Sequence, residues 1–334
     1  MTGSRNFIIR AIALISVIAL LPIFSSCNGN DTKKTEQSSE YHTITFNTNG
    51  GSLISAMEVK HGKMASAPKD PTLENYIFCR WQTTGGRAFF FEHYAVKEDL
   101  DLEAVWIKAT DLFSLAPMPD SDGVMITKIK RQEEFNSLVV PSVINGKTVE
   151  GIGAEAFSGI VESHAKKIVF PNTVRYVEMS AFESISLVEL VFNGPVSYLE
   201  ESSFEYCATL TSLKLGTGLT EIPFRAFSNC SSLKATDIPE GITSIKENAF
   251  GGCSSLRTVV LPSSLTTVEN GAFDDCTSIK SVFFKGSEEE FDAIDFTNGN
   301  KELTDATVYF YSEEQPTEEG VYWHYDKNNS PTIW

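Results

Sequence analysis

Four cysteines of this 334-residue chain recur at a spacing that could support chemistry. They recur every 23 residues, each three positions after a phenylalanine, and they are Cys207, Cys230, Cys253 and Cys276. Cysteine thiolates bind zinc, and in an oxidising compartment cysteines pair as disulfides. The fixed spacing adds a third hypothesis, in which the cysteines are packing residues of a repeated structural unit.

The repeat around the cysteines indicates what kind of unit that is. Phenylalanines at spacings of 22 to 25 residues mark its copies: Phe157, Phe182, Phe204, Phe227, Phe250, Phe273 and a degenerate Phe296. Short apolar runs such as "LTSLKL" and "LRTVVL" lie between them. A fixed period in the twenties with an L-x-x-L-x-L run predicts a solenoid in which each coil contributes one strand to a parallel sheet.

Solenoid geometry favours buried thiols over a metal site. Equivalent atoms of stacked coils lie ~4.8 Å apart, so the four thiols would form a row of about 14 Å, whereas zinc needs its ligands around one point. Ile160 and Ile185 occupy the equivalent position in the first two coils, which indicates an apolar slot. We therefore expect buried thiols. Disulfide pairing of neighbours is the alternative, because the expected Cα spacing permits it.

Sequence motifs for catalysis are missing elsewhere. The five histidines are scattered without an HExxH spacing, and the chain has no GxSxG motif or glycine-rich phosphate loop. The acidic runs 287–292 and 312–319 lack the ligand spacing of a calcium loop. A net charge of -17 opposes polyphosphate partners. The sequence thus predicts a protein that is not an enzyme, with no metal site, no cofactor and no nucleic-acid partner.

The first 40 residues predict export and anchoring. Arg5 and Arg10 precede an apolar run over 11–21 that is too short to span a ~30 Å hydrocarbon core. Small residues then lead to Cys27, and this arrangement resembles a bacterial lipobox, in which the cysteine is acylated. We expect a lipoprotein signal peptide over 1–27 and a flexible tether over 28–40, with the protein lipid-anchored to the bacterial outer membrane at the cell surface. An ordinary signal peptide cleaved nearby is the alternative.

Residues 41–108 form a different unit. The segments "HTITFNTNGG" and "DLDLEAVW" alternate apolar and polar residues, the first of them ends in an Asn-Gly-Gly turn, and "YIFCRW" is rich in aromatic residues; all three features predict strands. Together with "VKHGKMASAPKDPT" these segments resemble the internalin-type B repeat, also called the Listeria–Bacteroides repeat. The resemblance implies a small β-grasp-like module that serves as a stalk or spacer in surface proteins.

The repeated pattern "LxxLxLPxxLxxIxxxAFxxC" resembles the BspA-like leucine-rich repeat family of bacterial surface proteins over residues 138–334. The resemblance implies a mainly β fold, a right-handed leucine-rich-repeat solenoid of about 23-residue coils, with a C-terminal cap from about residue 300. Residues 109–137 are then a connecting or N-terminal cap segment. We expect the aromatic residues of 309–334 to seal the last coil rather than to bind sugars.

The outward positions of the strands are the candidate ligand-binding surface, because their side chains point away from the core. One row combines three apolar residues, expected to be exposed, with two charged ones: Val191, Lys214, Asp237, Val260 and Phe283. Tyr176 and Tyr198 form a smaller candidate patch on the second strand of each coil.

Two function classes fit these surfaces. The BspA-like resemblance implies adhesion or protein binding, with a macromolecular ligand such as a host or microbial surface protein, and matrix or plasma proteins as partner types. The alternative is a glycan-capture or assembly accessory protein of an outer-membrane polysaccharide system, in which aromatic rings stack on sugars. In both cases we expect a monomer that meets the membrane only through its lipid anchor.

Overall fold

A computed structural model describes residues 40–130, 135, 137–159, 167–213, 215–317, 320–328 and 330–334. The predicted signal peptide with Cys27, most of the tether, Ile160 and Lys214 lie outside the described residues. In the described ranges, no helix has both the length and the apolar character needed to cross a membrane.

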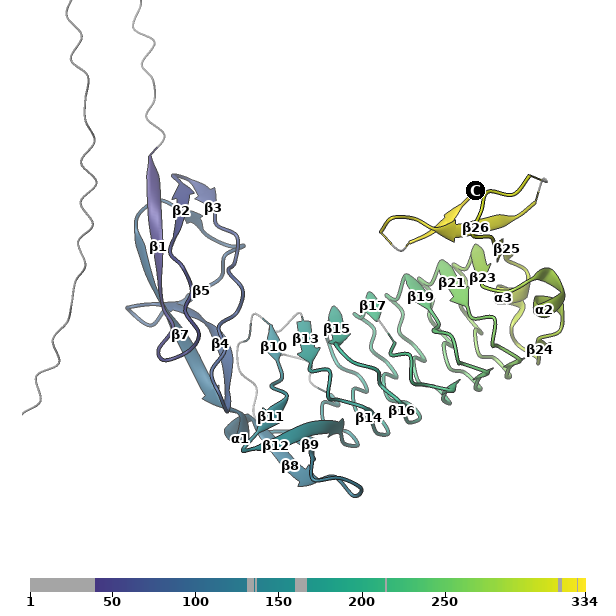
Figure 1. The fold of residues 1–334 in the computed structure, drawn as a ribbon, viewed down its shortest axis with the longest axis horizontal. Helices are drawn as coiled ribbons and strands as arrows, with labels where there is room; N and C mark the ends of the chain where they lie inside the picture. The colour runs from purple at the N-terminus through teal and green to yellow at the C-terminus, as the bar shows by residue number, and fades with distance from the viewer. Residues whose placement is uncertain are drawn as a thin grey trace, which may run out of the picture. The chain divides into compact units, whose positions relative to one another are not determined.

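The N-terminal module is a five-stranded sheet in the order β2-β1-β7-β4-β5 (Figure 1). Its strands are β1 (Tyr41–Asn47), β2 (Met57–Lys60), β4 (Tyr76–Thr83), β5 (Ala88–Phe89) and β7 (Leu100–Lys108). β1 and β7 run parallel, and the other neighbours are antiparallel. A separate two-stranded sheet joins β3 (Lys63–Met64) to β6 (Ala95–Val96). Alternating apolar residues form the core of the module, among them Ile44, Val59, Trp81 and Leu102.

A short segment leads from the module into the solenoid. After α1 (Ala109–Leu112), β8 (Phe113–Pro117) and β9 (Val124–Ile129) form an antiparallel hairpin. β9 then pairs in parallel with β12 (Lys147–Ile152), which also pairs with β11 (Val143–Ile144). The hairpin thereby covers the first coil, and the described part of the solenoid core includes Leu112 and Phe113 from this segment.

Each coil contributes one strand to each of two rows of parallel strands (Figure 1). The first row contains β10 (Leu138–Val139), β13 (Lys167–Phe170), β15 (Glu189–Phe192), β17 (Ser212–Leu213), β19 (Ala235–Asp237), β21 (Thr258–Leu261), β23 (Ser281–Phe284) and β25 (Thr307–Tyr311). The second row contains β12, β14 (Tyr176–Val177), β16 (Tyr198–Leu199), β18 (Glu221–Ile222), β20 (Ser244–Ile245), β22 (Thr267–Val268) and β24 (Asp295–Phe296). Among the described residues, strand pairing breaks on either side of the coil that contains β17 and β18: between β17 and β19 in the first row, and between β16 and β18 in the second. This confirms the mainly β leucine-rich-repeat solenoid.

Two side-chain ladders run through the core of the solenoid. The rings of Phe157, Phe182, Phe204, Phe227, Phe250 and Phe273 stack on one another with centroids 5.1 to 5.2 Å apart. The four repeat cysteines are fully buried, and each Sγ donates to the carbonyl oxygen of the repeat phenylalanine in the preceding coil at 3.1 to 3.2 Å. The predicted burial of the four thiols is confirmed. The adjacent thiol of Cys253, together with burial, raises the pKa of Cys276, which keeps it protonated.

The last coil departs from the repeat. Phe296 was predicted as a degenerate seventh repeat phenylalanine, but it pairs in register with Val268 and so takes the second-strand position instead. The reason is α2 (Glu288–Asp292), which lengthens this coil and displaces the pattern. No further repeat coil follows to accept the backbone N–H of Phe273, and the side chain of Asn300, just before α3 (Lys301–Thr304), takes that role. Its Oδ1 accepts the backbone N–H of Phe273 at 3.1 Å, as a backbone carbonyl does for Phe250.

Beyond the last coil the chain turns back as a hairpin. β26 (Tyr322–Tyr325) pairs in parallel with β25, and β27 (Pro331–Ile333) pairs antiparallel with β26. These strands continue the first row of the solenoid and form the yellow end of the chain in Figure 1. We call residues 322–333 the C-terminal hairpin.

Candidate binding surfaces of the solenoid

The outward face of the first strand row differs from its prediction. Val260 is 2% exposed and Phe283 is 5% exposed, so the expected exposure of these two side chains is wrong. The cause is the C-terminal hairpin, because Trp323 forms an apolar cluster with both residues. The rings of Phe283 and Trp323 meet edge to face at 5.4 Å, and Phe283 stacks on Tyr309 at 5.2 Å. The aromatic ending therefore covers the outward face of the sheet at β21 and β23.

Polar contacts fix the C-terminal hairpin in this position. Trp323 Nε1 donates to the carbonyl oxygen of Phe284 at 2.9 Å. The Tyr325 hydroxyl donates to Asp237 Oδ2 at 3.2 Å, and Lys285 Nζ lies 2.9 Å from Asp237 Oδ1. Burial, followed by the charge of Asp237, raises the pKa of Tyr325. Asp237, predicted as a ligand-binding residue, is thus engaged on both carboxylate oxygens by the chain itself.

The N-terminal half of the same strand row has no such cover among the described residues. Val139, Val169 and Val191 lie in register on β10, β13 and β15, and all three are at least partly exposed. Val191 borders a hollow of about 380 Å³ whose other lining residues include Pro195 and Leu215. Of the predicted row, Val191 therefore remains accessible.

The two predicted tyrosines lie side by side on the second strand row. Tyr176 pairs in register with Tyr198, and their rings are 5.9 Å apart. Tyr198 is 47% exposed, and its hydroxyl donates to Glu200 Oε1 at 3.0 Å. That hydrogen bond, with the charge of the Glu200 carboxylate, raises the pKa of Tyr198, so the hydroxyl stays protonated.

Tyr198 also lines an open groove of about 600 Å³, which we call the acidic groove. Its walls combine apolar side chains with five carboxylates and one ammonium group: Met179, Tyr198, Leu199, Pro223, Phe224, Glu200, Glu201, Glu221, Glu247, Glu269 and Lys246. This groove was not among the predicted binding surfaces. A signal was present, because Glu200, Lys246 and Glu269 each directly follow the second strand of their coil. Glu200 and Lys246 are two coils apart, and Lys246 and Glu269 are one coil apart.

The carboxylates of the acidic groove are held by neighbouring coils. Glu200 Oε2 accepts the backbone N–H of Met179 at 2.7 Å, and Glu269 Oε2 accepts that of Glu247 at 3.3 Å. Lys246 Nζ lies 2.9 Å from Glu269 and 3.4 Å from Glu221. The hydrogen bond to Glu269 raises the pKa of Lys246. Fixed carboxylates beside exposed aromatic surface can receive a basic side chain and the apolar stem that precedes it.

Comparison with family models identifies both parts of the chain. Residues 127–240 and 220–309 match the BspA-type leucine-rich repeat region, in six copies that together span more than half of the chain. Residues 42–105 match the Listeria–Bacteroides repeat domain. Both matched families are typically non-enzymatic binding modules, and no enzyme family was found.

Three solved structures are similar to this chain. A leucine-rich cell surface protein from Faecalibacterium prausnitzii is 25% identical over 54% of this chain and 40% of its own length, with a TM-score of 0.39. A leucine-rich repeat protein from T. pallidum is 27% identical over 61% of this chain and 86% of its own, with a TM-score of 0.37. A Bacteroides ovatus leucine-rich repeat protein is 17% identical over 60% and 70%, with a TM-score of 0.26.

The chain thus spans about two fifths of the F. prausnitzii protein. A comparison with curated proteins found no match. The six repeat copies agree with the structure, in which the repeat phenylalanines stack and each row of strands is parallel. The chain therefore belongs to the BspA-type leucine-rich repeat family and carries an N-terminal Listeria–Bacteroides repeat domain.

Proposed function

We propose that this protein is a non-enzymatic, lipid-anchored cell-surface protein whose solenoid binds a basic segment of a macromolecular partner in the acidic groove. The observation that carries the proposal is the groove itself, which five carboxylates and one ammonium group line together with Tyr198 and Phe224. Adhesion to a host or microbial surface protein is the role that this binding would serve.

Charge and apolar contact act together in this proposal. The whole chain carries a net charge of -17, which steers a basic partner towards it, and the fixed carboxylates then set its position. Burial of exposed aromatic surface contributes the affinity, at ~1.5–3 kcal/mol for each large side chain that becomes fully buried. Tyrosine is also enriched at recognition surfaces. Tyr176 and Tyr198, together with the uncovered Val191, remain the candidate residues of the original prediction.

Anchoring completes the proposed function. Acylation of Cys27 would fix the chain to the outer membrane, and the tether and N-terminal module would hold the solenoid away from the lipid surface. The Cys27→Ala variant should then leave the membrane fraction. If that variant still fractionates with membranes, the lipoprotein part of the proposal is wrong.

The binding test compares two exposed sites on the solenoid. Purified protein is immobilised and probed with a panel of matrix and plasma proteins at low and high salt. The double variant Tyr198→Ala with Phe224→Ala should lose capture, and the wild type should lose affinity as salt rises. Tyr206→Ala is the matched control, because Tyr206 is similarly exposed and does not line the groove. Unchanged capture in the double variant would contradict the proposal.

Glycan capture is the second candidate function, and the tyrosine pair favours it. Aromatic rings next to fixed carboxylates can stack on a sugar while the carboxylates accept hydrogen bonds from its hydroxyl groups. A neutral polysaccharide would bind with little dependence on salt, whereas the affinity of a basic protein segment would fall as salt rises. Competition with soluble neutral polysaccharide against soluble matrix protein therefore separates the two functions.

A further inference from the structure

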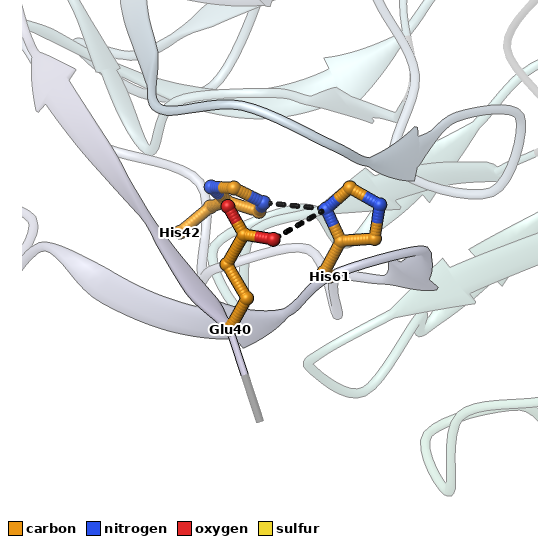
Figure 2. Close-up of side chains that lie close together, drawn as sticks. All are labelled: Glu40, His42 and His61. Carbon is orange, nitrogen blue, oxygen red and sulfur yellow. Dashed lines mark hydrogen bonds and ion pairs between the residues drawn. The ribbon is translucent and has the colours of Figure 1, made fainter. Parts of the chain in front are cut away.

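Three metal-ligating side chains meet in the N-terminal module, and none of them lines the acidic groove. They are Glu40, His42 and His61, and one ligand atom of each lies within 4.8 Å of the other two (Figure 2). His42 Nε2 is 2.8 Å from His61 Nδ1, and Glu40 Oε2 is 3.7 Å from the same Nδ1. The sequence predicted no metal site, because the two histidines are 19 residues apart and match no motif.

Strand pairing brings these residues together. β1 and β2 are antiparallel with His42 opposite Val59, and the backbone N–H of His61 donates to the carbonyl oxygen of Glu40 at 2.8 Å. Glu40 therefore lies opposite His61, and His42 is two residues from Glu40 on the same face of the sheet. The hydrophobic core of the module begins two residues further, at Ile44. The cluster is thus built by the register of the sheet.

The donor set matches a late first-row divalent ion. Zinc takes imidazole nitrogens at ~2.0–2.1 Å and carboxylate oxygens at ~2.0–2.2 Å, which places neighbouring ligand atoms of a tetrahedral site about 3.3 Å apart. The observed separations of 2.8 and 3.7 Å lie on either side of that value. Small rotations of two side chains would suffice, and both Glu40 and His61 have room to rotate, since their side chains are 68% and 48% exposed.

A fourth residue orients the buried histidine. His42 Nδ1 lies 3.8 Å from Asp99 Oδ1, and the same oxygen accepts the backbone N–H of Thr43 at 2.8 Å. A carboxylate that faces the second ring nitrogen of a histidine holds the tautomer in which the first nitrogen is free to bind metal. At 3.8 Å this is a charge contact and not yet a hydrogen bond; it is independent of the Glu40–His61 pair and lies on the opposite ring nitrogen from the cluster.

We propose that Glu40, His42 and His61 form a zinc-type metal site in which Asp99 positions His42 and one coordination position stays open to solvent. The bound ion ties the start of β1 to the residue that follows β2. Without metal, the backbone pairing of β1 with β2 and the His42–His61 hydrogen bond still join these two segments, and the ion would add to both. The open position leaves the ion able to accept a ligand from another molecule.

The test is calorimetric titration of the whole protein with zinc chloride. The protein is purified without a polyhistidine tag and first dialysed against a chelator. The wild type should bind one zinc ion per chain. His61→Ala should weaken binding more than about 100-fold, because loss of a group that merely orients a ligand already costs about 10- to 100-fold. Asp99→Asn should weaken binding about 10-fold. His93→Ala is the matched control and should bind as the wild type does, since His93 is an exposed histidine of the same module.

Further variants and a spectroscopic probe test whether zinc binds at Glu40, His42 and His61. Glu40→Gln changes a largely exposed side chain and should also weaken zinc binding. This variant takes the place of His61→Ala if His61→Ala does not fold. A visible absorption band of tetrahedral cobalt(II) that disappears in His61→Ala would support the three-ligand geometry. Failure of the wild type to bind zinc, or equal zinc affinity in the wild type and His61→Ala, would overturn the proposal and leave the two histidines as a hydrogen-bonded pair.

Discussion

The two strand rows of the solenoid come from the same coils, yet their outward faces differ. On the first row the C-terminal hairpin covers Val260 and Phe283, whereas on the second row Tyr198 and the acidic groove stay open. The repeat pattern specifies which side chains point outward on both rows. It does not specify what lies on top of them. The difference shows that exposure at a repeat position depends on the segments that flank the repeats.

Trp323 is the residue on which this difference depends most. Trp323→Ala removes a fully buried ring and the hydrogen bond to the Phe284 carbonyl, so it should lower the free energy of unfolding by about 3–5 kcal/mol. The hairpin should detach and expose Val260 and Phe283. Denaturant unfolding measures the first effect, and hydrogen exchange at β23 and β26 measures the second.

Trp334→Ala serves as the control for Trp323, because Trp334 is an exposed ring in the same C-terminal region. It should change the free energy of unfolding by less than Trp323→Ala does. Equal unfolding midpoints for wild type and Trp323→Ala would show that the cover contributes nothing to stability.

The coil that interrupts both rows should be sensitive to added volume. A Cβ on Gly216 would overlap the backbone nitrogen of Val196 in the preceding coil, which is backbone that cannot move aside cheaply. Gly216→Ala should therefore destabilise the protein by about 1–3 kcal/mol in thermal or denaturant unfolding. Gly85→Ala should be close to neutral, because its nearest neighbour would lie 3.8 Å away. A neutral Gly216→Ala would show that the coils can separate at the interruption.

The thiol ladder joins coils beneath both faces, and its effect should be smaller. Cys253→Ala leaves a cavity no larger than the lost sulfur atom and removes a weak hydrogen bond to the Phe227 carbonyl. It should lower the free energy of unfolding by on the order of 1 kcal/mol. Isoleucine should be tolerated better than a charged residue such as aspartate, because Ile185 occupies the same slot, buried, in an earlier coil. A disulfide between Cys230 and Cys253 in unreduced protein, detected by mass spectrometry, would contradict the buried thiols.

The sequence predicted the solenoid because its period is local and repeated six or more times. The same regularity predicted the buried cysteines, since the slot occupied by Cys207 is occupied by Ile185 one coil earlier. Phe296 was misassigned because α2 adds residues to one coil, and a count of residues cannot distinguish a lengthened coil from a complete repeat. Regular periodicity is informative only where every coil has the same length.

The candidate sites were less predictable because they depend on contacts between distant segments. Trp323 reaches Val260 across more than 60 residues, and no periodicity relates them. His42 and His61 meet through the register of β1 and β2, which the sequence does not state. Tyr176 and Tyr198 were found because they occupy equivalent positions in successive coils. Glu200 and Glu269 also share one repeat position, but Pro223 and Lys246 occupy that position in the two coils between them, so the acidic groove is less regular in sequence than the tyrosine pair.

The smallest expected effect concerns how the hairpin is held at its edge. Tyr325→Phe removes the hydrogen bond to Asp237 and should cost about 1 kcal/mol at neutral pH. The pKa of Tyr325 is higher in the folded state than the usual value of about 10, because burial and the nearby Asp237 carboxylate disfavour the phenolate. Folding therefore favours the protonated hydroxyl, and its contribution is complete below pH ~10 and is lost as the pH rises above that value.

Urea unfolding of the wild type and Tyr325→Phe at pH 7 and pH 10.5 tests this contribution. Both proteins lose stability at alkaline pH through their other tyrosines and lysines, so the informative quantity is the difference between the two midpoints. That difference should shrink or reverse at pH 10.5, because phenylalanine has no proton to lose. A difference that stays constant would mean that the Tyr325 hydroxyl does not hold the hairpin. The cover over Val260 and Phe283 would then depend on Trp323 and its apolar contacts.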